Sequence, residues 1–163
     1  MRIALSNDHA GYALKPHVLA FLMQQGHDVI DVGTADDTPV DFPLMTQRVT
    51  ALVTSGEAER GILVCGTGVG AAIAANKVPG IRAAVIHDTY VARQGVEHDD
   101  VNVACLGAWI VGPKIAEDVL SAYLDAQFSA DPDFRRRVAQ LADLEAVTRG
   151  TQGAAGDRQE ERH

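Results

Sequence analysis

Short apolar runs alternate along the chain with longer segments whose apolar residues recur at helical spacing. Each run is only a few residues long and is bounded by polar or glycine residues, as is typical of strands that are buried on both faces. The runs lie at residues 2–6, 28–32, 61–65, 81–86 and 102–106. The pattern therefore predicts five strands.

The segments between and after these runs predict helices. Residues 13–25 place leucines and a valine on one face, and residues 113–127 repeat this pattern after a proline that suits a first helical turn. The predicted helices are residues 13–25, 44–55, 71–76, 89–96, 113–127 and 132–147. Strands that alternate with helices indicate a parallel sheet.

The predicted fold is thus α/β, a three-layer, doubly wound, five-stranded parallel sheet (Rossmann-like) with helices on both faces. We expect one domain over residues 1–149. Residues 150–163 are polar and show no apolar periodicity, which predicts a disordered tail. In doubly wound folds ligands bind beyond the carboxyl ends of the strands, at the point where the strand order reverses.

A thiol, a hydroxyl and three glycines follow the third predicted strand, at Cys65, Thr67, Gly66, Gly68 and Gly70. Glycines allow a ligand to approach the backbone, and the start of the next helix presents unpaired N–H groups. Strand, glycine loop and helix together form a geometry that holds anions. The partial positive charge of a helix start also favours the thiolate form of a cysteine.

Other functions use similar loops. A phosphate-binding NTPase loop needs Lys-Ser/Thr after its last glycine, and a cysteine phosphatase needs an arginine, but Ala71 and Ala72 occupy these positions. A dinucleotide fingerprint needs one more residue between its last two glycines; Asp88 lies near where its ribose-binding acid would be, so that alternative stays open. A buried cysteine without a chemical role is another alternative.

Three pairs of histidine and aspartate occur at residues 8–9, 87–88 and 98–99, and such side chains suit divalent metals. Adjacent residues point in different directions, however, and no His-x-x-x-His spacing is present, so we expect no metal. We assign no role to the pair at 87–88. All three pairs come after predicted strands, so strand polarity alone can bring them to the edge where Cys65 lies.

Charge and cysteine content narrow the function classes. The formal net charge is −8, which argues against a basic surface for nucleic acid or membrane. Cys65 and Cys105 are the two cysteines; they lie in different predicted strands, and no secretory signal precedes them. We therefore expect reduced thiols and a cytoplasmic location. No apolar run approaches the length of a membrane span.

Four motifs in this order resemble the sugar-phosphate isomerase family that contains type B ribose-5-phosphate isomerase and the galactose-6-phosphate isomerase subunits. They are DHAG, CGTGVG, AANK followed by GIRA, and HDDVN, at residues 8–11, 65–70, 74–77 with 80–83, and 98–102. The resemblance extends from about residue 2 to about residue 138. CGTGVG followed by AANK is its most specific part.

The resemblance implies an aldose–ketose isomerase that needs neither metal nor cofactor and interconverts ribose 5-phosphate and ribulose 5-phosphate in the pentose phosphate pathway of carbohydrate metabolism. The chemistry needs a base beside the carbonyl carbon and donors that face the enediolate oxygen. Cys65 is our candidate base and Thr67 our candidate proton relay. The N–H groups of Gly66, Gly68 and Gly70 are candidate oxyanion donors.

The resemblance also assigns roles outside this loop. It implies that His98 opens the sugar ring, and that Asp8 and His9 contact substrate hydroxyls or phosphate. It further implies a homodimer, with a tetramer as the alternative, whose sites borrow groups from the neighbouring subunit.

This chain departs from the family around the expected phosphate. Asp99 replaces an asparagine, Trp109 replaces a phosphate-binding arginine, and Asp133 replaces another, whereas Arg137 is kept and Arg136 stands beside it. We therefore expect Asp99, Arg136 and Arg137 to contact substrate. Alternative substrates are a tetrose phosphate, another sugar phosphate and an unphosphorylated sugar. An alternative of another class is a nucleotide-binding or signalling module of the same architecture.

Overall fold

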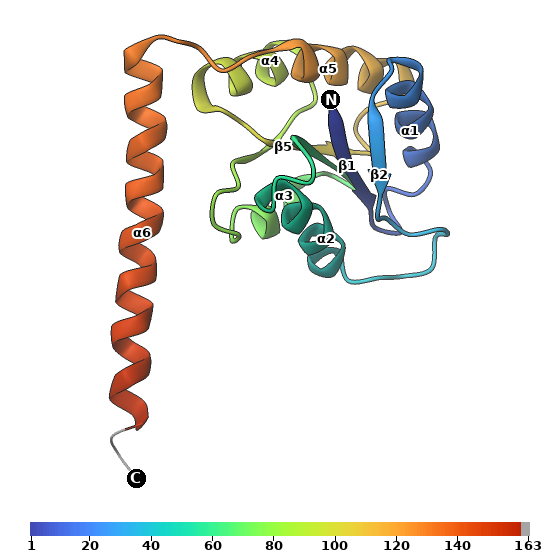
Figure 1. The fold of residues 1–163 in the computed structure, drawn as a ribbon. Helices are drawn as coiled ribbons and strands as arrows, with labels where there is room; N and C mark the ends of the chain where they lie inside the picture. The colour runs from blue at the N-terminus through green and yellow to red at the C-terminus, as the bar shows by residue number, and fades with distance from the viewer. Residues whose placement is uncertain (161–163) are drawn as a thin grey trace. The chain divides into compact units, whose positions relative to one another are not determined.

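The computed structural model describes residues 1–160 of the 163-residue chain, and their side chains as far as residue 147. The chain divides into two compact units, Met1–Phe128 and a second that begins at Ser129. The first unit contains a sheet covered by helices, and the second contains one long helix (Figure 1).

The sheet has five parallel strands in the order β2-β1-β3-β5-β4. The strands are β1 Arg2–Asn7, β2 Asp28–Asp31, β3 Arg60–Cys65, β4 Ala83–Val85 and β5 Val103–Gly107. The first and last residues of each strand differ by no more than two positions from those predicted. The agreement is close because a run of apolar residues that is buried on both faces has few other stable conformations.

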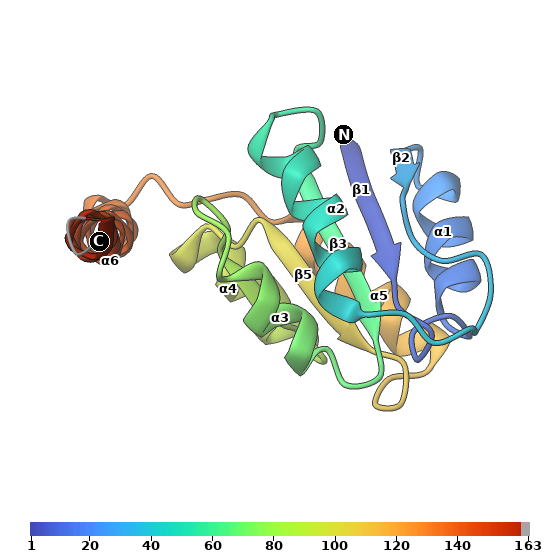
Figure 2. The ribbon, with the colours of Figure 1, turned by 90° about the horizontal axis from the view of Figure 1, so that it is seen from below.

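Helices cover both faces of this sheet. They are α1 Lys15–Gln24, α2 Phe42–Thr54, α3 Val69–Ala75, α4 Thr89–Asp99 and α5 Pro113–Asp125. One apolar cluster contains Leu22 of α1, Val96 of α4 and Leu120 of α5, whereas a second contains Val49 of α2 and Ala72 of α3. Figures 1 and 2 show the same division, with α1, α4 and α5 on one face and α2 and α3 on the other. The predicted three-layer doubly wound fold is confirmed.

The second unit contains α6, which runs from Pro132 to Glu160 rather than ending at residue 147. Its last turns fall in the segment 150–163 that the sequence predicts to be disordered, and residues 161–163 lie outside the described residues. These turns have no apolar periodicity, so nothing in the sequence pattern signalled a helix there. The division of the chain at residue 149 stays a prediction. Among the residues described, no helix combines the length and apolar character that crossing a membrane requires.

Arg60, at the start of β3, holds the carboxyl end of α5. Its guanidinium donates hydrogen bonds to the carbonyl of Tyr123 and, at 2.6 Å, to that of Ala126. The guanidinium carbon also lies 5.0 Å from the centre of the Tyr123 ring. That tyrosine is fully buried, and burial raises the pKa of its hydroxyl. Carbonyls at a helix end lack intrahelical donors, so Arg60 supplies donors that α5 itself cannot.

We expect Arg60→Met to lower the free energy of unfolding by about 1.5–3 kcal/mol, because it removes charged donors from partly buried carbonyls. Urea denaturation measures this loss. Arg2→Met is the matched control: Arg2 pairs with Asp28 at 2.8 Å, but both side chains are more than half exposed. The control should cost less than about 1 kcal/mol. Equal losses would show that the contacts of Arg60 stabilise the fold no more than an exposed ion pair does.

Candidate active site

The carboxyl ends of β1, β3 and β5 lie level at one edge of the sheet. Asn7 is paired with Val64, and Cys65 is paired with Gly107. Beyond the strand, the N–H of Asp8 donates to the carbonyl of Val64 at 3.3 Å. The chain leaves β1 for one face of the sheet and β3 for the other, so these neighbours form a switch point of the kind that binds ligands.

The glycine loop after β3 is arranged around the sulfur of Cys65. The Gly68 N–H donates to Cys65 Sγ at 3.0 Å, and an N–H donor stabilises negative charge on the sulfur. Gly68 has a φ of +81°, a left-handed conformation that favours glycine, and it is the residue from which α3 begins. The Val69 N–H donates to Thr67 Oγ1 at 3.4 Å. Two N–H groups of the loop are thus directed at its own side chains.

Asp8 is buried beside this loop at the end of β1. Its Oδ1 accepts a hydrogen bond from the Gly11 N–H at 2.9 Å, which closes a turn before α1. The turn uses one carboxylate oxygen, and the second is the one that can accept a hydrogen bond from a ligand hydroxyl. A side chain at Gly11 would lie 1.9 Å from the carbonyl oxygen of Val64, so only glycine lets this turn pack on β3.

His9 is exposed at the same edge. Its Nδ1 accepts a hydrogen bond from the Val40 N–H at 3.3 Å. A ring nitrogen that accepts carries no proton, so the proton of neutral His9 is assigned to Nε2. His9 therefore presents an N–H donor, and its ring is oriented by the long loop that follows β2.

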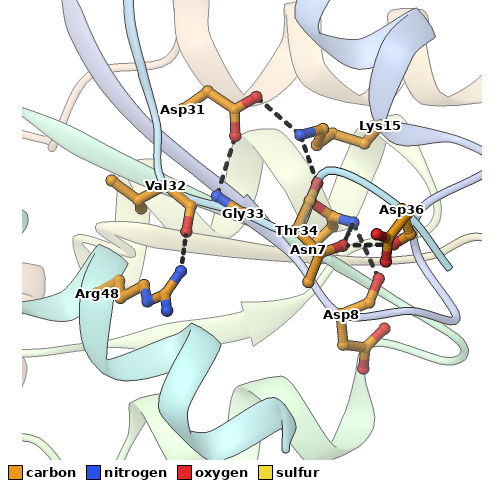
Figure 3. A network of polar contacts seen from close by, with 9 residues as sticks. All are labelled: Asn7, Asp8, Lys15, Asp31, Val32, Gly33, Thr34, Asp36 and Arg48. Carbon is orange, nitrogen blue, oxygen red and sulfur yellow. Dashed lines mark hydrogen bonds and ion pairs between the residues drawn. The ribbon is translucent and has the colours of Figure 1, made fainter. Parts of the chain in front are cut away.

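Figure 3 shows a polar network that fixes this loop against β1. Asn7 Nδ2 donates to the carbonyl of Asp8 and to Thr34 Oγ1, both at 2.9 Å. Lys15 Nζ donates to Asp31 Oδ2 at 2.8 Å and to the carbonyl of Thr34 at 2.9 Å. Asn7 and Lys15 are buried, where a charged or polar group needs such partners. Sequence analysis did not single out either residue, because one polar residue in a strand or helix predicts no partner.

The pair at residues 87–88 has a structural role at this edge. His87 Nε2 accepts a hydrogen bond from the Gly107 N–H at 3.0 Å, beyond the end of β4. Burial lowers the pKa of His87, against a smaller opposing effect of the Asp88 carboxylate. Asp88 accepts from the Val91 N–H at 2.8 Å and caps α4. That carboxylate is thus engaged in a helix cap, which weakens the dinucleotide alternative.

Two aromatic rings cover the glycine loop. A side chain added at Gly66 would meet the ring of Trp109 at 2.7 Å, and one added at Gly70 would meet the ring of Phe42 at 3.2 Å. The backbone N–H of Trp109 donates to the Gly66 carbonyl at 3.0 Å, while 73% of the residue remains exposed. Sequence analysis missed Phe42; an aromatic residue directly after a long polar loop was the available signal.

The structure does not bring His98 and Asp99 to this edge. They are the last residues of α4, which extends beyond its predicted end at residue 96 and leads into β5 at Val103. The expectation that they share an edge with Cys65 within one chain was wrong, because a helix between parallel strands returns to the amino ends of the strands. At roughly 3.3 Å per residue, β5 alone spans more than 10 Å between the two edges.

Arg136 and Arg137 lie on α6, in the second unit, where both pair with Asp133. Arg136 lies 2.5 Å and Arg137 lies 3.9 Å from the carboxylate. Arg136 in particular holds the pKa of Asp133 below its ordinary value. Within the part of the chain that the structure describes, no group of three or more histidine, cysteine, aspartate and glutamate side chains is placed to hold a metal ion.

Comparison with known proteins agrees with the motifs. Residues 3–141 match the model of a family described as Ribose/Galactose Isomerase. The chain is 42% identical to ribose-5-phosphate isomerase B of Escherichia coli, over 78% of this chain and 85% of that protein. It is 38% identical to D-erythrulose-4-phosphate isomerase of Pectobacterium atrosepticum, over 78% and 85%. A solved structure of Clostridium thermocellum ribose-5-phosphate isomerase B superposes with a TM-score of 0.88, at 43% identity, over 91% of this chain and 99% of that one.

In the folded protein, iodoacetamide should modify Cys65 at least about tenfold faster than Cys105. Cys105 lies within β5 with no exposed surface, and burial raises the pKa of its thiol, so its reactive thiolate is scarce. Timed labelling followed by peptide mass spectrometry measures the two rates. In urea the rates should converge, which is the control. Equal rates in the folded protein would contradict the assignment of Cys65, rather than Cys105, as the reactive thiol.

Proposed function

This chain belongs to the ribose/galactose isomerase family of sugar-phosphate isomerases, and we propose that it interconverts ribose 5-phosphate and ribulose 5-phosphate. One observation carries the proposal: the sulfur of Cys65 accepts a hydrogen bond from the Gly68 N–H at the switch point of the sheet, beside Asp8. A base at that position, surrounded by backbone donors, meets the needs of an enediolate reaction.

In the proposed reaction the Cys65 thiolate removes the proton from C2 of the open-chain aldose. The electron pair of the C–H bond forms the C1–C2 double bond, and the aldehyde oxygen becomes the oxyanion of an enediolate. The thiol then returns the proton to C1. The hydroxyl proton on O2 moves to O1, and the Thr67 hydroxyl is suited to relay it. The ketose results without any external oxidant or reductant.

The oxyanion needs donors that the protein has not already used. Gly68 N–H is directed at the sulfur, so its contribution is to the thiolate. Gly70 and Ala71 lie in the first turn of α3, where N–H groups have no intrahelical acceptor. We assign the oxyanion to these N–H groups together with that of Gly66.

Asp8 and His9 are suited to hold the sugar. Asp8 can accept a hydrogen bond from a hydroxyl, and His9 Nε2 can donate one to a hydroxyl or to the phosphate. Because pentose phosphates are mainly cyclic, the ring must open before the proton transfer. We assign ring opening to His98, with Asp99 beside it.

The position of His98 argues that two copies of the chain form each site. His98 and Cys65 lie at opposite ends of the sheet, so a site that uses both must take one of them from a neighbour. Exposed apolar side chains on α2 and α3 are the kind of surface that a second copy would cover. They include Leu44, Val69 and Ile73. We therefore propose a homodimer with shared sites.

Cys65→Ala should lower kcat for ribose 5-phosphate roughly 10²–10⁴-fold, the usual contribution of a positioned base. Cys65→Ser should also be poor, because a hydroxyl is a far weaker base. Cys105→Ala is the matched control and should leave kcat unchanged, since that thiol is buried within β5. Formation of the ketose is the measurement. Wild-type turnover in folded Cys65→Ala would remove the cysteine from the mechanism.

Mixing inactive variants extends this test to the shared site. If Cys65→Ala and His98→Asn are unfolded and refolded together, half of the dimers are hybrids and each hybrid has one intact site. Activity should then return to about one quarter of wild type. Each variant refolded alone is the control. No recovery in the mixture would overturn the proposal that Cys65 and His98 from two copies share a site.

A shorter sugar phosphate is the second candidate substrate. The ring of Trp109 covers Gly66 and leaves a large aromatic surface where the family resemblance leads us to expect an arginine. An indole carries no positive charge, and its bulk suits a smaller substrate. A relative of this chain, at 38% identity, is named for a tetrose phosphate.

The phosphate itself can be tested through Arg137. We expect the wild type to prefer ribose 5-phosphate to ribose, and Arg137→Ala to raise KM for the phosphate about tenfold or more with little change in kcat, because an arginine–phosphate pair contributes binding in every state. Lys114→Ala, which removes an exposed cation from α5, is the control. Steady-state kinetics on ribose, ribose 5-phosphate and erythrose 4-phosphate decide the substrate. A preference for free ribose would overturn the phosphate assignment and leave the Cys65 chemistry intact.

A further inference from the structure

Arg82 and Asp100 join the segment before β4 to the carboxyl end of α4. Arg82 Nε donates to the carbonyl of Asp100 at 2.7 Å, and its Nη2 donates to the carboxylate of the same residue at 2.6 Å. Both side chains are partly buried. Asp100 directly follows His98 and Asp99, so these two hydrogen bonds hold the backbone immediately beyond the proposed ring-opening residue.

Two asparagines extend the connection. The Arg82 N–H donates to Asn102 Oδ1 at 2.8 Å, and Asn102 Nδ2 donates to the carbonyl of Gly80 at 2.9 Å. Asn76 forms a reciprocal pair with the backbone of Ala83, with both hydrogen bonds at 2.8 Å. The AANK, GIRA and HDDVN motifs therefore form one bonded unit, and none of these contacts belongs to the glycine loop.

The end of α4 has a defined geometry. Asp100 has a φ of +52° and is the one non-glycine residue with a positive φ among those described. In this conformation its N–H donates to the carbonyl of Val96, and the N–H of Val101 donates to that of Gly95, both at 3.1 Å. A residue in the left-handed conformation at this position satisfies the last carbonyls of a helix and stops the helix from extending further. The final turn, which carries His98, is thus closed by the cap and clamped by Arg82.

We propose that Arg82 and Asp100 are positioning residues that aim His98 at the sugar ring in the site of a second copy. This inference rests on the proposed function. A group that acts across an interface is only as well placed as the element that carries it, and the last turn of a helix frays unless it is held. A misplacement of about 1 Å can cost roughly 10²-fold in rate. The clamp acts through His98 and touches no substrate.

A double-mutant cycle distinguishes positioning from simple stabilisation. Arg82→Lys keeps the positive charge but removes the pair of hydrogen bonds that Nε and Nη2 donate to Asp100. Asp100→Asn removes the carboxylate, and asparagine tolerates a positive φ. Each should lower kcat for ribose 5-phosphate roughly 10–100-fold. In a His98→Asn background neither should lower it further, because the residue they position is already absent.

Arg60→Lys is the matched control. Arg60 makes the same kind of guanidinium–carbonyl contact at the end of α5, a helix that carries no proposed site residue. It should leave kcat unchanged in both backgrounds. A cooperative thermal unfolding transition establishes that each variant is folded. If Arg82→Lys is unfolded, the cycle is measured with Asp100→Asn and His98→Asn alone.

The outcomes distinguish a failure of the positioning role of Arg82 and Asp100 from a failure of the proposed role of His98. Wild-type kcat in the folded Arg82 and Asp100 variants, or losses that add fully to that of His98→Asn, would overturn the positioning role and leave the proposed function standing. Wild-type kcat in His98→Asn itself would instead remove His98 from the proposed function, and the inference with it. A loss that disappears in the His98→Asn background supports the inference.

Discussion

Parallel pairing of β1, β3 and β5 is the constraint on which the rest of this structure depends. The register brings the ends of these strands to one level, so residues that are more than fifty positions apart in the sequence, Asp8 and Cys65, become neighbours. Because consecutive strands are joined by helices, everything at the end of a strand lies at one edge and everything at the end of a helix lies at the other. The same rule that assembles the thiol, the glycine loop and Asp8 sends His98 away from them.

Sequence predicted the sheet and its carboxyl edge well, for a physical reason. Apolar runs such as 61–65 must be buried on both faces, and the polarity of parallel strands then brings the residues after each strand to a common edge. His98 was misplaced because it follows a helix rather than a strand, and α4 returns the chain to the amino ends of the strands. Asp100, in a left-handed conformation held by Arg82, ends that helix at Asp99, three residues after its predicted end. A side chain that contacts the backbone eighteen residues away leaves no periodic trace.

Close contacts around the glycine loop were beyond sequence reasoning for a related cause. The spacing of the glycines indicates that something approaches the backbone, but it does not say what. In this structure the rings of Trp109 and Phe42 approach Gly66 and Gly70, and the backbone of β3 approaches Gly11. Glycine therefore serves two purposes at this edge: it exposes N–H groups to a ligand, and it admits neighbouring parts of the same protein.

The placement of Cys65 and His98 at opposite ends of the sheet bears on how this protein behaves at low concentration. A single chain contains its own apolar core, with one cluster on each face of the sheet. Its two proposed reactive ends, however, belong to different sites. If the proposed dimer forms, association governs catalysis separately from the fold of each chain: on dilution below its dissociation constant, specific activity falls while the secondary structure stays intact.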